Sequence, residues 1–311
     1  MTSAKWILGV DGGGTKTTGV LVAEDGTLGA QETSGGSSLT TYGIAKAVER
    51  VFEVLKKCCT AASCTPDQLS SVGIGLAGAG RAEDREEFQR DFTDYCQRNG
   101  FHLSQVIVET DWRIALEAAF PTGSGIVVIA GTGSIACARA RDGTFHRVGG
   151  EGKLLGDKGS GYAISQDGLN AAIRSHEGRE EKTLLLEYAL QHFEVSSVDD
   201  LKVKIHSEDT DIASFASKIL VAARQKDTVA LDVLSRGVTE LVDLVKALIA
   251  KIQPKHKIAI AFMGGLLEKE NVYTTMLREQ LQASIPNLLM LKPKFPAAYG
   301  ATILALQPFS K

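Results

Sequence analysis

Asp11 is followed by three consecutive glycines and then by Thr15 and Lys16, between two stretches of apolar residues. A glycine backbone exposes its N–H groups without a side chain in the way, which suits the oxygens of a phosphate chain. The threonine hydroxyl and the lysine ammonium would add donors and positive charge. Asp11 leaves an apolar strand and is placed to hold a hydrated divalent cation. Residues 11–17 therefore predict a turn for nucleotide phosphate and Mg²⁺, lined by Gly12, Gly13 and Gly14.

Two common phosphate motifs do not describe this segment. The P-loop pattern requires Gly-Lys followed by Ser or Thr, whereas Thr15 separates Gly14 from Lys16 here. The dinucleotide-binding pattern G-x-G-x-x-G opens a helix, whereas the residues after Lys16 favour a strand. A plain glycine-rich hairpin without a ligand remains the alternative.

A second Gly/Thr turn is expected at residues 131–134, again between two apolar strands. Alone, the tetrapeptide Gly-Thr-Gly-Ser is more typical of a tight turn than of a binding site. It occupies the same place as residues 11–17 in a repeated plan of strand, Gly/Thr turn and strand, which indicates an internal duplication. We therefore expect Thr132 and Gly133 to bind the same polyphosphate from its other side.

Asp111 ends an apolar strand and opens a helical pattern. Open α/β sheets place catalytic groups at the carboxyl ends of their strands. A carboxylate at this position could accept the proton of a sugar hydroxyl that attacks the terminal phosphate of a nucleotide. The alternative is a helix N-cap, for which Asp is a preferred residue, and the two roles are compatible.

Two more glycine-rich segments are candidates for ligand contact. Residues 149–161 combine glycines and polar or charged residues with only two leucines, which excludes regular structure. Hydrogen bonds to a polyol such as a sugar would hold this backbone, and a flexible surface loop is the alternative. Gly264 and Gly265 follow an apolar strand and would let a nucleotide base or ribose approach closely, although such a pair means little alone.

The spacing of apolar residues predicts the elements that would position these groups. Strands are expected in residues 6–22 on both sides of the glycines, and at 72–77 and 106–109; helices are expected at 42–59, 82–99 and 112–120. Strands at 125–130 and 136–141 begin a second round. Helical spacing then dominates residues 160–250, including 213–225 and 238–252, before a strand at 258–262 and a helix at 297–306. This alternation predicts an α/β fold with mostly parallel sheets.

Length and composition limit the class of protein. A chain of 311 residues with 44% hydrophobic and 23% charged residues is expected to fold into two globular domains. The formal net charge of −3 favours neither nucleic acid nor a membrane surface as a partner. No stretch approaches the roughly 20 apolar residues of a membrane span, and residues 1–5 leave no room for a signal-peptide core before the first strand. We expect a cytoplasmic protein, whose five cysteines form neither a disulfide framework nor a zinc site.

The motifs above, in this order, resemble the superfamily of sugar kinases, heat-shock-70 proteins and actin. More narrowly, the chain resembles the N-acetylglucosamine and glucosamine kinase branch of the BadF/BadG/BcrA/BcrD-type ATPases. The resemblance extends from Gly9 to Leu306. It rests on DGGGTKT at 11–17, TDWRIALEAA at 110–119, AGTGS at 130–134, LLGDKGSGY at 154–162 and AAYGATILA at 297–305.

The resemblance implies two ribonuclease-H-like, actin-like ATPase domains with a cleft between them. They would comprise residues 1–115 together with the C-terminal helix 297–311, and residues 116–296. ATP and Mg²⁺ are the implied cofactors, and a homodimer the implied assembly. The resemblance places Asp11, Gly13, Thr15 and Lys16 on phosphate and Mg²⁺, Thr132 on the γ-phosphate, Gly264 and Gly265 by the adenosine, and Asp111 as the base. Ser38, Gly78, Gly150, Glu151 and Asp157 would contact the sugar.

The implied reaction is transfer of the γ-phosphate of ATP to a hydroxyl, expected to be the 6-hydroxyl, of an amino sugar. The chain departs from the family pattern at Glu151, where a Trp is common, and near Ser38, where an Asn is common. A carboxylate at Glu151 could pair with an ammonium and favour free glucosamine over N-acetylglucosamine.

Two alternative functions are an activator ATPase and a nucleotide-dependent regulator. An activator ATPase of the dehydratase type needs cysteine pairs for an iron–sulfur cluster in its second domain, whereas Cys137 is the last cysteine of this chain. A nucleotide-dependent regulator would carry a helix-turn-helix before the first strand, and would be free to lose Asp111. The sequence therefore favours the kinase.

Overall fold

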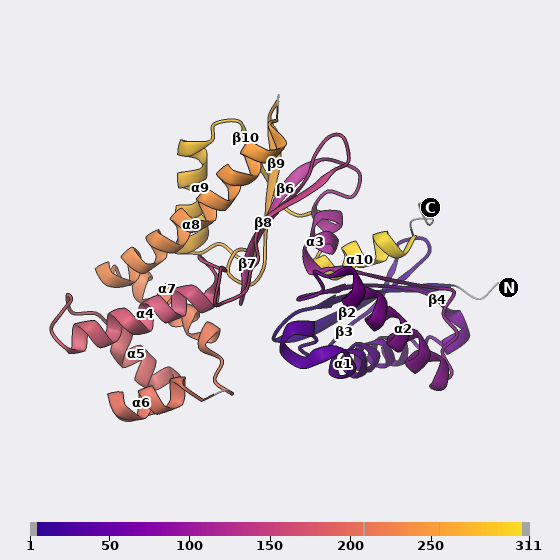
Figure 1. Ribbon diagram of the computed structural model, residues 1–311, viewed down its shortest axis with the longest axis horizontal. Coiled ribbons are helices and arrows are strands. Elements are labelled where there is room, and N and C mark those ends of the chain that lie inside the picture. Colours follow the sequence, from indigo (N-terminus) through magenta and orange to yellow (C-terminus); the bar gives the residue numbers. More distant parts are fainter. Residues whose placement is uncertain (1–4, 208, 255, 307–311) are drawn as a thin grey trace. The chain divides into compact units, whose positions relative to one another are not determined.

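The computed structural model describes residues 5–207, 209–254 and 256–306, and divides into two compact units. The first unit holds the chain up to Gly123 and from Lys292 onward, and the second holds Ser124–Leu291. In Figure 1 the last helix, α10 (Ala297–Leu306), is drawn in yellow beside the indigo and purple elements of the first unit. The expected domain limits, residues 1–115 with 297–311 and residues 116–296, stay a prediction.

A five-stranded mixed sheet forms the centre of the first unit, in the order β3-β2-β1-β4-β5. Strands β1 to β3 are an antiparallel meander, and β4 and β5 extend β1 on its other side in parallel. The strands are β1 (Trp6–Gly12), β2 (Lys16–Ala23), β3 (Leu28–Gly35), β4 (Leu69–Leu76) and β5 (Gln105–Thr110).

Helices cover both faces of this sheet. On one face α1 (Leu39–Ala61) and α2 (Ala82–Arg98) bury a core with Leu8, Val10 and Ile74, and the short helix η1 (Pro66–Gln68) leads into β4. On the other face α10 packs on β1 and β4, and α3 (Asp111–Ala119) packs on α10.

Two strand glycines permit the close approach of α10. A Cβ added at Gly9 would lie 2.1 Å from the carbonyl oxygen of Ala298, and one at Gly73 would lie 2.0 Å from that of Ala301. Any side chain at these positions would push the helix off the sheet. The glycines of β1 and β4 therefore fix the layer that also carries α3.

The second unit repeats the strand plan of the first. Its sheet has the order β10-β9-β6-β7-β8, in which β6 to β8 form the antiparallel meander and β9 and β10 add in parallel. The strands are β6 (Gly125–Ala130), β7 (Ser134–Arg139), β8 (Phe145–Gly149), β9 (Ile258–Met263) and β10 (Leu288–Leu291). The matching order confirms the expected α/β fold of two ribonuclease-H-like halves. The expectation of mostly parallel sheets is wrong, because the short turns after β1 and β6 join antiparallel strands and half of the pairings in each sheet are antiparallel.

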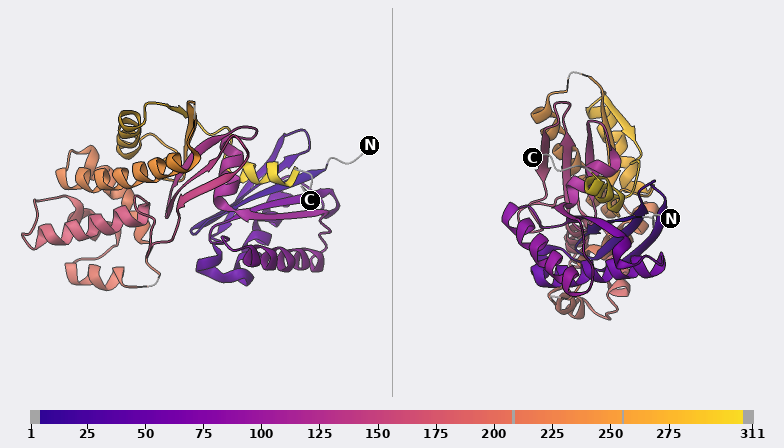
Figure 2. Two further views of the ribbon diagram at one scale, coloured as in Figure 1. Left: turned by 45° about the horizontal axis from the view of Figure 1, so that its top comes forward. Right: turned by 90° about the vertical axis from the view of Figure 1, so that its right-hand side faces the viewer.

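Helices dominate the middle of the second unit, as the spacing predicts. Helix α8 packs on β7 and β8, α4 and α7 pack on α8, and α5 packs on α4 (Figures 1 and 2). The helices are α4 (Gly161–His176), α5 (Leu185–His192), α6 (Val198–Ile205), η2 (Ile212–Phe215), α7 (Ala216–Arg224), α8 (Thr228–Ile252) and α9 (Val272–Ser284).

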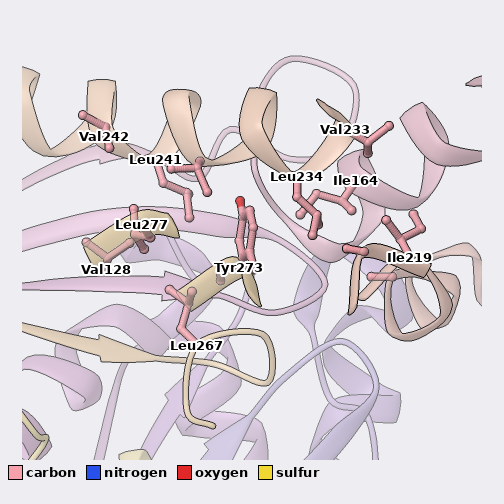
Figure 3. Packing of buried hydrophobic residues seen from close by; sticks show 14 of the residues in the cluster. Val128, Ile164, Ile219, Val233, Leu234, Leu241, Val242, Leu267, Tyr273 and Leu277 are labelled. Carbon is pink, nitrogen blue, oxygen red and sulfur yellow. The ribbon is translucent and has the colours of Figure 1, made fainter. Parts of the chain in front are cut away.

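Tyr273 links the core of this unit to the loop before α4. Its ring is fully buried among Leu234, Leu241 and Leu267 (Figure 3), and its hydroxyl donates to the carbonyl oxygen of Gly159 at 2.7 Å. Burial raises the pKa of the Tyr273 hydroxyl far above its usual range, so the group stays a neutral donor.

Several elements differ from their predicted limits. The helix predicted at 42–59 begins at Leu39 and is interrupted at Gly43, where φ is 73° and ψ is 168°. The helix predicted at 238–252 begins ten residues earlier, because the Asp227 side chain caps it by accepting from the N–H of Ala230. Strand β10 and helix α9 were not predicted. None of the helices in the described chain is long and apolar enough to cross a membrane.

We predict that Gly300→Ala destabilises the first unit. A Cβ at Gly300 would lie 1.9 Å from the carbonyl oxygen of Ile114 and 2.7 Å from the amide nitrogen of Ala118, where α10 crosses α3. We expect a loss of about 1–3 kcal/mol in unfolding free energy by urea denaturation, beyond any gain in helix propensity. Gly80→Ala is the control, because a Cβ there meets no atom within 4 Å. Equal stability of the two variants would contradict the proposed crossing.

Candidate functional site

The turn after β1 is held by hydrogen bonds on its carbonyl side. The N–H of Gly13 donates to the carbonyl oxygen of Lys16 at 3.0 Å, which closes the turn at residues 13–15. The carbonyl oxygen of Gly13 accepts from the N–H groups of Ser37 and Ser38 at 3.0 and 3.1 Å. The turn is therefore fastened to the segment that follows β3, which we call the 36–40 loop.

The opposite side of this turn is open. A Cβ added at Gly14 would meet no atom within 4 Å, and one at Gly13 would meet only the carbonyl oxygen of Lys16, at 3.3 Å. Thr15 and Lys16 are exposed, and Asp11 is half-buried in β1 opposite Thr18 and Gly75. An exposed glycine backbone with a lysine and a carboxylate beside it fits a phosphate chain with its cation.

The 36–40 loop also meets the end of β4. Ser38 is buried, and its hydroxyl lies 3.1 Å from that of Thr40. Gly78 has a φ of +80° and would place a Cβ 2.8 Å from the amide nitrogen of Thr40. The structure therefore brings Ser38 and Gly78 together, as the sugar-contact prediction requires.

Asp111 lies on the same edge of the sheet as the 13–15 turn. The register pairs Gly12 with Leu76 and Leu76 with Thr110, so the residues that follow β1 and β5 emerge at one edge. Two strand spacings separate them by about 10 Å. Asp111 is the first residue of α3 and Thr110 is its N-cap, so the N-cap alternative for Asp111 is wrong.

The surroundings of Asp111 combine open hydrogen-bonding capacity with a rigid helix. Its Oδ1 accepts from the N–H of Trp112 at 2.8 Å. The buried hydroxyl of Thr110 has no hydrogen-bond partner within the described part of the chain, which leaves capacity for a bound hydroxyl group. One turn further on, Arg113 and Glu117 form an ion pair at 2.9 Å, and the Glu117 side chain is 1% exposed. Both residues belong to α3, so this pair stabilises the helix itself.

The turn after β6 has the same design in the second unit. The N–H of Gly131 donates to the carbonyl oxygen of Gly133 at 2.9 Å. The carbonyl oxygens of Gly131 and Thr132 accept from the first N–H groups of α4, those of Gly161 at 2.7 Å and Tyr162 at 3.3 Å. The structure thus places Thr132 and Gly133 in a closed turn, residues 131–133, against a helix N-terminus.

The turn after β9 lies beside the 131–133 turn. Gly264 has a φ of +89°, and a Cβ there would lie 2.5 Å from the carbonyl oxygen of Ala130. A Cβ at Gly131 would lie 3.8 Å from the amide nitrogen of Gly265, whereas one at Gly265 would meet nothing within 4 Å. Both predicted nucleotide segments of this unit are therefore neighbours with open backbone.

Asp157 joins the 149–161 loop to the 131–133 turn. Its φ is +53°, and its carboxylate accepts from the N–H groups of Ser134 and Gly152. A Cβ at Gly133 would lie 2.7 Å from Oδ2 of Asp157. Burial raises the pKa of this carboxyl, and the charge of Glu151 raises it further. Asp157 thus braces the turn, in addition to any sugar contact.

Glu151 already has a cationic partner. Its Oε1 lies 3.2 Å from an Nη of Arg147, which also donates to the carbonyl oxygen of Gly149 at 2.9 Å. Gly149, Gly150 and Gly152 all have positive φ, between 74° and 81°, so the loop is a chain of glycine turns, as predicted. Leu154 and Leu155 at its tip are 87% and 88% exposed.

Comparisons with known proteins agree with this arrangement. The profile of the BadF/BadG/BcrA/BcrD ATPase family matches residues 8–305. The chain belongs to this family. An N-acetylmuramic acid/N-acetylglucosamine kinase of Clostridium acetobutylicum is 30% identical over 306 residues, which cover 97% of this chain and 98% of that protein. An N-acetyl-D-glucosamine kinase of Dictyostelium discoideum is 26% identical, with 98% of each chain covered.

A solved structure is similar in fold to this chain over nearly its whole length. A Chromobacterium violaceum protein, by name a candidate N-acetylglucosamine kinase, superposes with a TM-score of 0.78 at 27% identity. The match covers 98% of this chain and 100% of that one.

The family motifs did not reveal every residue of this site. Tyr42 and Arg50 contact the 13–15 turn or the 36–40 loop but lie in α1, where their spacing is that of ordinary helix-surface residues. The hydrogen bonds of Asp157 also escape sequence reasoning, because the partner N–H groups belong to Ser134 and Gly152. A Gly-Asp pair within a glycine-rich loop was the available signal for Asp157.

We predict opposite pH effects for two aspartates of the second unit. The raised pKa of Asp157 favours its protonated form in the folded protein, so stability relative to Asp157→Asn falls as pH rises from about 4 through the folded pKa. Asp142, an exposed residue of the β7–β8 turn, has a pKa lowered by the hydroxyl and the N–H of Thr144. Stability relative to Asp142→Asn therefore falls as pH drops below about 4.

Urea denaturation of the wild type and both variants between pH 3 and pH 7 measures these differences. Each variant serves as the matched control of the other, since both replace an aspartate by its amide in the same unit. A stability difference for Asp157→Asn that grows with pH would contradict the assigned burial.

Proposed function

We propose that this protein is an ATP-dependent kinase of amino sugars, with N-acetylglucosamine as the first candidate substrate. The observation that carries the proposal is the Gly/Thr turn, with hydrogen-bonded carbonyl groups, that recurs at the same point of both units, after β1 and after β6. The relatives of Clostridium acetobutylicum and Dictyostelium discoideum, named as kinases of N-acetylated amino sugars, support the substrate class. The two units would be the two functional domains, with α10 belonging to the first.

Each unit would supply part of the ATP site. In this proposal the carbonyl-side hydrogen bonds of both turns support their backbone N–H groups as phosphate donors, and the glycines of the β9–α9 turn admit the adenosine. The residues are Asp11, Gly12, Gly13, Gly14, Thr15, Lys16, Thr132, Gly133, Gly264 and Gly265. Asp11 would hold Mg²⁺ through water, and the ion would neutralise charge on the phosphate oxygens.

Asp111 would be the catalytic base. Its carboxylate would take the proton of the attacking sugar hydroxyl, proposed to be the 6-hydroxyl, as the oxygen bonds to the γ-phosphorus and the bond to the bridging oxygen of ADP breaks. The hydrogen bond from the N–H of Trp112 would help to orient the carboxylate for this contact. Placement at the start of a rigid helix would keep the carboxylate in position for transfer.

The sugar would be held by residues from two loops and the helix start. Ser38, Gly78 and Asp111 come from the first unit, and Gly150, Glu151 and Asp157 from the second. Because Arg147 neutralises Glu151, we favour the N-acetylated sugar over the charged glucosamine. A homodimer and a cytoplasmic location stay predictions from the sequence.

The test of this function is ADP release with Mg-ATP against a panel of sugars. The panel comprises glucosamine, N-acetylglucosamine, N-acetylmuramic acid, glucose and N-acetylmannosamine. We expect saturable turnover, greatest for an N-acetylated amino sugar. ATP binding without turnover of any sugar would favour a regulatory or activating ATPase instead.

We predict that Asp111→Asn abolishes transfer and leaves ATP binding nearly intact. Loss of a general base should lower kcat about 10²- to 10⁴-fold, because the amide cannot accept the proton. Stopped assays for kcat and calorimetry for ATP binding measure the two effects separately. Asp91→Asn, an exposed position on α2, is the control and should keep the wild-type rate. A variant at Asp111 with full kcat would remove the base assignment.

We predict that Glu151→Gln changes the preference between glucosamine and N-acetylglucosamine by less than about threefold in kcat/KM. An exposed carboxylate that is already paired with a guanidinium adds little attraction for a substrate ammonium. Kinetics with both sugars at one ionic strength measure the ratio. A loss of tenfold or more for glucosamine alone would show that Glu151 recognises the ammonium.

A further inference from the structure

The hydroxyl of Tyr42 reaches the 13–15 turn from α1. It donates to the carbonyl oxygen of Gly14 at 3.0 Å, across 28 residues of sequence. Together with the bonds from Ser37 and Ser38 to the carbonyl of Gly13, this contact occupies two successive carbonyl groups of the turn. All three donors and both acceptors belong to the first unit, so the arrangement is internal to it.

Arg50 fixes the position of the Tyr42 ring. Its guanidinium carbon lies 4.1 Å from the ring centroid, the distance of a cation–π contact. The same guanidinium donates to the carbonyl oxygen of Gly36, at the start of the 36–40 loop. Arg50 is half-buried and two helical turns beyond Tyr42, so one side chain joins the tyrosine to the loop.

Gly43 explains how Tyr42 can face the turn. Its φ of 73° and ψ of 168° interrupt α1 after the first turn, in a region of backbone conformation that is open almost only to glycine. The first turn of α1, which includes Tyr42, is therefore not a continuation of the longer part of the helix. That longer part packs on the sheet. Space is not the reason for this glycine, because a Cβ there would meet no atom within 4 Å.

In these peptide units, the direction of the carbonyl group determines the direction of the N–H group. In a trans peptide the C=O and the N–H of the same unit point in opposite directions. Carbonyls of Gly13 and Gly14 that face residues 37–42 therefore turn the N–H groups of Gly14 and Thr15 the other way, toward the open side of the turn. Those N–H groups are the ones that a phosphate chain would use.

We propose that Tyr42 and Arg50 are positioning residues for ATP, which hold the 13–15 turn with its N–H groups directed at the phosphates. The inference rests on the proposed function, since it assumes that this turn binds ATP. Through Gly36, the same two residues couple the phosphate turn to the loop that carries Ser38.

Tyr42→Phe tests the proposal, because it removes the hydroxyl and keeps the ring under Arg50. One lost neutral hydrogen bond should weaken ATP binding about two- to tenfold by calorimetry and raise the KM for ATP by a similar factor. Adenosine, which has no phosphate, should bind as it does to the wild type. Arg50→Met, which removes both the stacking charge and the Gly36 bond, should act in the same direction.

Tyr299→Phe is the matched control. Its hydroxyl donates to the carbonyl oxygen of Gly26 at 2.6 Å, in the β2–β3 turn of the same unit. It should lose a similar bond without any change in ATP binding. Equal ATP affinity of wild type, Tyr42→Phe and Tyr299→Phe would overturn the proposal, as would an equal loss for ATP and adenosine.

Calorimetry separates this inference from the proposed function. Phosphate-dependent weakening in Tyr42→Phe supports the positioning role even where no sugar in the panel is phosphorylated. A wild-type protein that binds no nucleotide would overturn both.

Discussion

In both units, the carbonyl groups of the Gly/Thr turn accept hydrogen bonds from a neighbouring segment. The proposed phosphate contacts of each unit depend on this constraint. In the first unit the Gly13 and Gly14 carbonyls accept from Ser37, Ser38 and Tyr42. In the second, the Gly131 and Thr132 carbonyls accept from the first N–H groups of α4. A buried or half-buried carbonyl needs such a donor, and a trans peptide then directs the adjoining N–H away from it. The direction of the N–H groups thus follows from where the carbonyls find their partners.

Close packing at three glycines, two in strands and one in α10, fixes the place of Asp111 in the first unit. Gly9 and Gly73 let α10 lie directly on β1 and β4, and Gly300 lets α3 cross α10. At each of these three contacts the nearest atom is a backbone carbonyl oxygen, so the position of α3 has little freedom to adjust. Asp111 begins that helix, one residue beyond the register that ties β5 to β1. The carboxylate proposed as the base is therefore positioned by packing on the α10 face of the sheet.

Local patterns in the sequence were sufficient for both turns and for most strands and long helices, but not for β10 and α9. The strand order that the two sheets share agrees with the duplication that those turns indicate. What the sequence could not supply depends on contacts between distant residues. The N–H of Ser134 on Asp157 and the Tyr42 bond join segments whose approach only the fold determines. The interruption at Gly43 was also missed, since helical spacing continues on both sides of it.

The Gly/Thr turns of the two units have similar hydrogen bonds but different sources of positive charge. In the second unit the donors behind the turn are the first N–H groups of a 16-residue helix, whose N-terminus carries partial positive charge. Hydrogen bonds in series polarise one another, so the bonds from Gly161 and Tyr162 pass part of that charge to the 131–133 turn. The donors behind the 13–15 turn are two serine amides and a neutral tyrosine hydroxyl, which offer no helix N-terminus of that length. Lys16, which follows that turn directly, supplies a full charge there instead. A duplicated fold can therefore give two turns of similar shape whose positive charge has different sources, a lysine side chain in one and a helix N-terminus in the other.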